Sequence, residues 1–254
     1  MSFFDPNVAV HSDLFEMGGA GHLALLAFAF ALLGVMIAFR HQLPALRRNR
    51  SFMAGTAGFV LGIEAMSYAF KFVFPFHPAW ERLPLHLCAS LKIAFALCVL
   101  YERYDLARYI SIWAIGAGFI SFANLNLGGA SFANFGFWHY VIGHLYILLM
   151  PVFLYLTGDF RYDLSMHLRS CAGGGLWSFV VFLINWGFDT NYMYSGPHND
   201  VAVPFVPDVM MVWPFNYVSY VLTALVLLNI IYALLRFFQG RGEQKPALVP
   251  AVAR

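Results

Sequence analysis

The amino-acid sequence predicts an all-α, polytopic membrane protein: a bundle of seven transmembrane helices with its amino terminus outside and its carboxyl terminus in the cytoplasm. Three observations carry this prediction: the composition, the length of the apolar segments and the placement of the basic residues. Of the 254 residues, 61% are hydrophobic and only 11% are charged, and the mean hydropathy is +0.68. A soluble domain of this length needs more charge to cover its surface.

Seven apolar segments follow one another, and each is long enough to cross a bilayer. Only helices and closed barrels satisfy backbone groups in lipid, and segments of this length without strict polar alternation favour helices. No linker or shift in composition divides them, so we expect one domain over residues 1–238 and a short polar tail over residues 239–254. The predicted spans are residues 20–39, 52–74, 84–101, 106–126, 136–157, 171–192 and 214–238.

The basic residues alternate between the two sides of this predicted bundle. The connections on one side contain a single basic residue, Arg82. An excess of Lys and Arg marks the cytoplasmic side, so the amino terminus is expected outside. The segments that follow the first, third, fifth and seventh spans hold the other twelve loop residues of this kind: Arg40, Arg47, Arg48, Arg50, Arg103, Arg108, Arg161, Arg169, Arg236, Arg241, Lys245 and Arg254.

With this orientation, the polar side chains of the spans fall in the outer half of the bilayer. At a rise of about 1.5 Å per residue, Glu64 and Lys92 lie at the same depth near the midplane. Polar groups in lipid face a cavity or one another, so we expect one polar pocket that opens toward the outer leaflet. The other polar or amphipathic residues expected around it are His22, His86, Cys88, Asn124, His139, His144, Asn185, Asp189, Asn191 and Trp213.

Glu64 and Lys92 are the two charges expected deepest in the bilayer. Because a buried charge is seldom left unpaired, we expect these residues to pair with each other or each with a histidine. An ion pair that only fixes helix packing is a simpler interpretation of these two charges than a role in catalysis.

Cys88 is a candidate nucleophile. It lies four residues before Lys92 on the same helix face, and a neighbouring cation stabilises the nucleophilic thiolate. The alternative is a small buried apolar residue, which is the usual role of a single cysteine. His86 falls on nearly the opposite face and is a poor base for Cys88. His139 and His144 are about 140° apart around their helix, so His144 is expected in the pocket and His139 nearer the interface.

Other functional classes lack their sequence signatures. The chain has no glycine-rich phosphate loop, no triad pattern of a soluble hydrolase and no basic patch for nucleic acid, and the last span has no Lys for a retinal Schiff base. We therefore expect no cofactor and no nucleic-acid partner.

Several short motifs follow one another in a characteristic order along nearly the whole chain. They are Gly21-His22-Leu23, Glu64, the segment Leu83–Cys88, Trp113 with Gly116, Gly143-His144, Asn185 with Thr190–Met193, and Trp213-Pro214. Their order resembles the YwaF-like family of bacterial integral membrane proteins, which is related to eukaryotic transmembrane protein 164. The chain departs from the resemblance at Asn134, where a His is expected, and at Ser195–His198, which lacks a Lys-Pro pair.

For the eukaryotic branch, the resemblance implies a cysteine-dependent acyltransferase that moves fatty acyl groups between phospholipids. Carried over to this chain, it implies Cys88 as the nucleophile and His144 as the base, and we expect Glu64 as a further catalytic residue and Asn191 in the same site. It also implies membrane phospholipids as partners and the inner (plasma) membrane of a bacterium as the location. The expected supporting residues are His22, His86, Lys92, Asn124, His139, Asn185, Asp189, Asn191 and Trp213.

Two other functions remain open from the residues alone. One is a metal-assisted lipid hydrolase, in which His22, His86, His139 and His144 surround a zinc-activated water. The other is a carrier or channel whose ionisable residues move protons or a solute. The apolar inner halves of the spans count against the carrier, because a pathway needs polar groups on both sides.

Overall fold

The computed structural model is helical, without strands, over the residues that it describes, which are residue 3 and residues 15–73, 82–125, 127, 132–159, 161–198 and 208–242. Six helices in these ranges are long and apolar enough to cross a membrane, which confirms the prediction of a multi-pass membrane protein. They are α1 (Ala20–Ala38), α3 (Arg50–Val73), α5 (Tyr104–Ala123), α6 (Phe135–Leu156), α7 (Leu164–Phe188) and α8 (Phe215–Gly242). The shorter helices are α2 (Leu43–Arg48), α4 (Leu87–Leu100), η3 (Tyr192–Tyr194) and η4 (Asp208–Met210).

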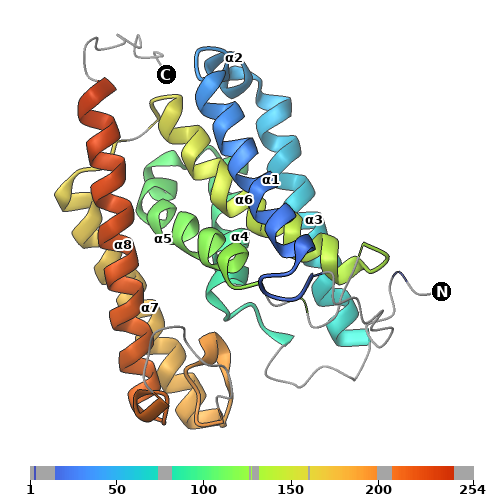
Figure 1. Ribbon diagram of the computed structural model, residues 1–254, viewed down its shortest axis with the longest axis vertical. Coiled ribbons are helices and arrows are strands. Elements are labelled where there is room, and N and C mark those ends of the chain that lie inside the picture. Colours follow the sequence, from blue (N-terminus) through green and yellow to red (C-terminus); the bar gives the residue numbers. More distant parts are fainter. Residues whose placement is uncertain are drawn as a thin grey trace.

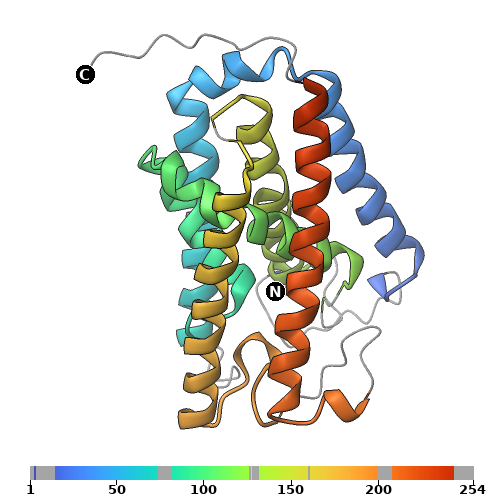
Figure 2. The ribbon, with the colours of Figure 1, turned by 90° about the vertical axis from the view of Figure 1, so that its left-hand side faces the viewer.

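Helix α5 occupies the centre of the bundle. It packs against α4, α6, α7 and α8 and has a smaller contact with α1. The pair α7 and α8 stands on one side of it, and α1 and α3 stand on the other (Figures 1 and 2). The core of the bundle contains fully buried apolar side chains from α4, α5 and α6. Examples are Phe95, Ile112, Ile147 and Leu154.

Helix α4 is shorter than the predicted third span. Its 14 residues cover roughly 21 Å at 1.5 Å per residue, less than the ~30 Å of hydrocarbon in a bilayer. Pro84 does not occupy the first helical turn, because the chain forms a separate turn there: the Leu85 N–H donates to the Leu83 carbonyl at 2.9 Å. His86 then caps α4 with an extended backbone, φ −63° and ψ 137°. The first residues of this predicted span, 84–86, are therefore not part of the helix.

Helix α7 begins seven residues before the predicted sixth span and ends four residues earlier. Its start is set by Asp163, whose side chain accepts a hydrogen bond from the Met166 N–H at 2.8 Å. Its end is set by Asp189, which adopts a left-handed conformation with φ 52°. An apolar window misses the first two turns because they contain His167 and Arg169. Helix α8 likewise continues to Gly242, into the predicted polar tail.

Charged side chains tie the helices together at the end of the bundle where α2 lies and α8 finishes (Figure 1). Arg47 of α2 donates to Asp159, with Nη2 and Oδ1 2.6 Å apart. Its guanidinium also lies over the Tyr104 ring, 3.9 Å from the centroid. Arg236 of α8 donates to the Tyr162 carbonyl at 3.1 Å. These contacts lie at the end that the distribution of basic residues predicts to be cytoplasmic.

Candidate functional site

Three ionisable side chains from three helices meet in the interior. Lys92 Nζ of α4 lies 2.5 Å from Glu64 Oε1 of α3, and both side chains are 3% exposed. His139 Nε2 of α6 lies 2.9 Å from the same oxygen. The expected pairing of the two buried charges is confirmed. His139, which was expected outside the pocket, also belongs to this cluster, because α6 brings this residue against α3 one turn after the helix begins.

The distances in this cluster fix how its protons are shared. One ring nitrogen cannot both donate and accept, so His139 Nε2–H donates to Glu64 and shares no proton with Lys92 Nζ, which lies 3.4 Å away. Lys92 and His139 thus both contact one carboxylate oxygen, Glu64 Oε1. The second carboxylate oxygen, Glu64 Oε2, is buried and has no hydrogen-bond partner among the described residues.

Gly143 makes room for the lysine. A Cβ atom at this position would lie 2.6 Å from Lys92 Cδ and 3.2 Å from Lys92 Nζ. A side chain at this position would push the lysine out of its place beside Glu64. The Gly143-His144 motif of the sequence therefore has a packing function in this chain.

Cys88 is the second residue of α4, and it is half-buried beside the last turn of α5. Its Sγ lies 3.6 Å from the Ser121 hydroxyl. The Tyr140 hydroxyl donates to the Ser121 carbonyl at 2.6 Å. His144 Nδ1 in turn lies 2.6 Å from the Tyr140 carbonyl. Ser121 and Tyr140 were not predicted as site residues, although both are polar positions in otherwise apolar spans.

The hydrogen bond of His144 determines its tautomer. A carbonyl only accepts, so Nδ1 carries the proton and Nε2 of the neutral ring keeps its lone pair, which is the form that a general base needs. Cys88 and His144 have no direct hydrogen bond among the described residues. The bonds given above use the side chain and the backbone of Ser121 and of Tyr140 separately, so they do not form one continuous hydrogen-bonded chain from Cys88 to His144.

His22 and His86 make separate contacts. His22 Nδ1 accepts from the Gly18 N–H, and its Nε2 donates to the Phe122 carbonyl, both at 2.8 Å. His86 Nδ1 accepts from the Met193 N–H at 3.3 Å. In the part of the chain that the structure describes, no group of three or more His, Cys, Asp and Glu residues is arranged to hold a metal. The zinc hypothesis therefore has no donor set within those residues.

Asn185 is fully buried and uses all of its hydrogen-bonding groups to hold the segment after α7. Its Nδ2 donates to the Tyr192 carbonyl at 2.8 Å and to Ser195 Oγ at 3.1 Å. Its Oδ1 accepts from Thr190 Oγ1 at 2.8 Å and from the Tyr192 N–H at 2.9 Å. The structure thus gives Asn185 the role of a structural anchor.

The other asparagines at this end also bind the backbone or end a helix. Asn191 Oδ1 accepts from the Gly196 N–H at 3.0 Å. Asn134 caps α6 and accepts from the Gly136 N–H at 2.7 Å. Asn124 is the half-buried residue that ends α5.

Asp189 and Trp213 lie apart from the ion cluster and from Cys88. Asp189 is exposed and pairs with His198 at 3.1 Å. Trp213 packs beside Phe182 and Trp186, with ring centroids 6.2 and 6.3 Å away. Among the described residues, neither forms a hydrogen bond or an ion pair with Cys88, Glu64 or Lys92.

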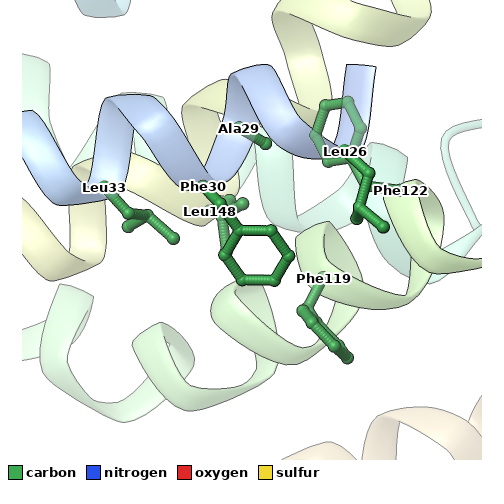
Figure 3. A pocket seen from close by; sticks show the side chains of 7 residues that line it. All are labelled: Leu26, Ala29, Phe30, Leu33, Phe119, Phe122 and Leu148. Carbon is green, nitrogen blue, oxygen red and sulfur yellow. The ribbon is translucent and has the colours of Figure 1, made fainter. Parts of the chain in front are cut away.

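Two hollows lie along α1, and the side chains that line them are apolar. The smaller one, about 10 Å³, lies between α1, α5 and α6 (Figure 3) and is lined by Leu26, Ala29, Phe30, Leu33, Phe119, Phe122 and Leu148. The larger one, about 290 Å³, is lined by Phe15, Ala20, Gly21, Ala24, Leu25 and Phe132. None of the predicted site residues lines either hollow.

These features define a helical multi-pass membrane protein in which a buried Glu–Lys–His cluster lies one helical turn from a cysteine. The chain belongs to the TMEM164 family, whose sequence pattern matches residues 17–232. The match reaches from before α1 into α8 and contains every site residue named above, and it agrees with the resemblance to the YwaF-like proteins. No curated protein and no solved structure matches the chain.

Proposed function

We propose that this protein is a lipid acyltransferase, or transacylase, of the bacterial inner membrane, with Cys88 as its nucleophile. The observation that carries the proposal is the position of Cys88. It lies at the amino end of α4, one turn from the buried Lys92 and 3.6 Å from the Ser121 hydroxyl. Free backbone N–H groups at a helix start and a nearby cation both stabilise a thiolate.

The proposed reaction has two acyl-transfer steps. The Cys88 thiol gives its proton to His144 Nε2, and the thiolate attacks the ester carbonyl of a donor phospholipid. A C–S bond forms, the ester C–O bond breaks, and the leaving lyso-lipid oxygen takes the proton back from His144. In the second step, an acceptor hydroxyl loses its proton to His144 and attacks the thioester; the new ester C–O bond forms, the C–S bond breaks, and the leaving Cys88 thiolate takes the proton from His144. Because Cys88 and His144 are not in direct contact, a bound lipid or water completes the proton path in this scheme.

In this scheme, the ion cluster of Glu64, Lys92 and His139 holds a positive charge close to Cys88. Lys92 is held by Glu64 and His139 and confined by Gly143, so its charge stays one turn from Cys88. A fixed charge near the thiol contributes more than a mobile one because no reorganisation is needed when the thiolate forms.

The proposal places Cys88 toward the outer leaflet, with seven membrane crossings and the amino terminus outside. The observation behind it is the alternation of basic residues, together with α4 as a seventh, short crossing. Reporter fusions after Arg50 and Arg169 are expected to report the cytoplasm, and a fusion at Gly129 the exterior. A cytoplasmic signal from Gly129 would remove the outer-leaflet assignment.

The acyl-enzyme is the direct test of the proposed reaction. After the purified protein is incubated with phospholipid, intact-mass and peptide mass spectrometry should show an acyl group on Cys88. Cys88→Ala should lose the adduct, whereas Cys98→Ser and Cys171→Ser, which change half-buried thiols elsewhere in the bundle, should keep it. Equal acylation of all three cysteines, or continued lipid turnover by Cys88→Ala, would refute the cysteine mechanism.

A further inference from the structure

Two arginines from different helices converge on one tyrosine hydroxyl at the charged end of the bundle. Arg108 Nη2 of α5 lies 2.6 Å from the Tyr109 hydroxyl oxygen. Its guanidinium carbon lies 4.7 Å from the centroid of the same ring. Arg169 of α7 also interacts with this hydroxyl. The phenol oxygen therefore accepts from one cation and lies beside a second.

These two arginines lack the acidic partners that neighbouring arginines have. Ion pairs at the same end join Arg47 to Asp159, Arg50 to Glu102 and Arg103 to Asp105. Neither member of the converging pair has an acidic partner among the described residues.

The buried part of the Arg108 side chain also lacks a hydrogen-bond acceptor among the described residues. Its Nε is buried and has no hydrogen-bond partner in the described part of the chain. Two cations near one neutral oxygen repel each other, and a buried guanidinium N–H without an acceptor is unfavourable. The arrangement is therefore short of one anionic acceptor.

The frame around the two arginines is well defined. Ser170 Oγ of α7 donates to the Tyr109 carbonyl of α5, and Trp113 Nε1 of α5 donates to the Ser170 carbonyl at 2.9 Å. These reciprocal bonds fix α5 against α7 next to the arginines. The spacing of Arg108 and Arg169 is thus set by two packed helices and not by a loop.

We propose that Arg108 and Arg169 together bind the phosphoryl group of an anionic phospholipid headgroup. Guanidinium groups bind phosphate oxygens through paired N–H donors, and basic pockets between transmembrane helices are suited to anionic headgroups. Arg108 lies about 6 Å along α5 from Tyr104, the first residue of this membrane-spanning helix, and is therefore close to the end of the span. The site is at the opposite end of the bundle from Cys88, so it is separate from the proposed acyl-transfer site and independent of that reaction.

Lipid retention by the purified full-length protein tests this site. The protein in neutral detergent is incubated with equal amounts of phosphatidylglycerol and phosphatidylcholine, and bound lipid is counted by native mass spectrometry. We expect about tenfold preference for the anionic lipid, and about tenfold weaker retention in Arg108→Gln and in Arg169→Gln, the loss expected for one charge-assisted contact. Arg103→Gln is the matched control, because its exposed partner is Asp105, and it should retain the lipid normally.

Two further arms separate the sources of phosphate and guard against misfolding. Inorganic phosphate should raise the unfolding temperature less than phosphatidylglycerol does, and equal stabilisation would show a free-anion site and overturn the headgroup assignment. Arg169 is exposed, so Arg169→Gln should fold even if Arg108→Gln does not, and Arg108→Lys keeps the charge but loses the paired donors. Unchanged lipid retention in Arg169→Gln, or equal retention of the two lipids, would also overturn the proposal.

Discussion

Glu64→Gln is expected to lower the stability of the protein by about 3–5 kcal/mol, the usual result of leaving a buried charge without its partner. It removes the only carboxylate of the described ion cluster and leaves the Lys92 ammonium with 3% exposure and no counter-charge. Lys92→Met should cost less, because the Glu64 carboxylate keeps its hydrogen bond from His139. The unfolding temperature in detergent, followed by size-exclusion chromatography of heated samples, measures both changes.

The double variant Glu64→Gln/Lys92→Met is the control for this prediction. It removes both charges, so it should be more stable than the sum of the single losses implies. Losses that simply add would show that the two residues do not interact. If stability returns and acylation of Cys88 returns with it, the pair is structural; if stability returns alone, the pair also serves the reaction.

Gly143 gives an independent check on the path of Lys92. Gly143→Ala should destabilise the protein by about 1–3 kcal/mol through overpacking, because the new Cβ overlaps the lysine side chain. In a Lys92→Ala background the same change should cost little. Gly62→Ala of α3 is the matched control, since a Cβ there meets nothing within 4 Å.

Gly174→Ala is expected to have the second large effect. Overpacking should lower the free energy of unfolding by about 1–3 kcal/mol or more. A Cβ at Gly174 would overlap the indole ring of Trp113, which is held in place by its bond to the Ser170 carbonyl of the same helix, α7. The ring cannot move aside without breaking that bond and separating α5 from α7. Thermal unfolding in detergent measures the loss.

The neighbouring glycines provide matched controls on the same helical turn. A Cβ at Gly173 or at Gly175 meets no atom within 4 Å. Alanine is preferred to glycine in a helix by up to about 1 kcal/mol, so Gly173→Ala and Gly175→Ala should be neutral or stabilising. Equal destabilisation by all three changes would mean that α7 does not pack on Trp113 as described.

The long helices could be predicted because lipid imposes a simple rule on the sequence. Backbone groups in hydrocarbon must bond within their own helix, so each crossing appears as a long apolar segment. The rule fails where other forces set the ends. Asp163 starts α7 with a side-chain cap two turns before the apolar segment, and the turn at Pro84 delays α4 until Leu87. Both effects are local hydrogen bonds that a hydropathy window does not register.

The candidate site could be predicted only in part. The cost of burying an isolated charge was enough to predict that Glu64 and Lys92 pair with each other or each with a histidine, since they are the charges at matching depth on consecutive helices. It could not show that His139 completes the cluster, because that depends on how α6 is rotated against α3. It also could not separate Asn185, which is consumed by backbone hydrogen bonds, from a residue free to contact substrate.

By itself, the sequence determined that the chain crosses a membrane several times, which end carries the basic residues, and that Glu64 needs a cation. These follow from transfer free energies, which depend on residue type and position along the chain. Only the tertiary structure decided that Ser121 lies beside Cys88, that Gly143 lets Lys92 pass, and that Arg108 and Arg169 converge on one phenol. Such contacts depend on the rotation and crossing of helices distant in sequence, and side-chain packing, which is specific to the folded bundle, sets both.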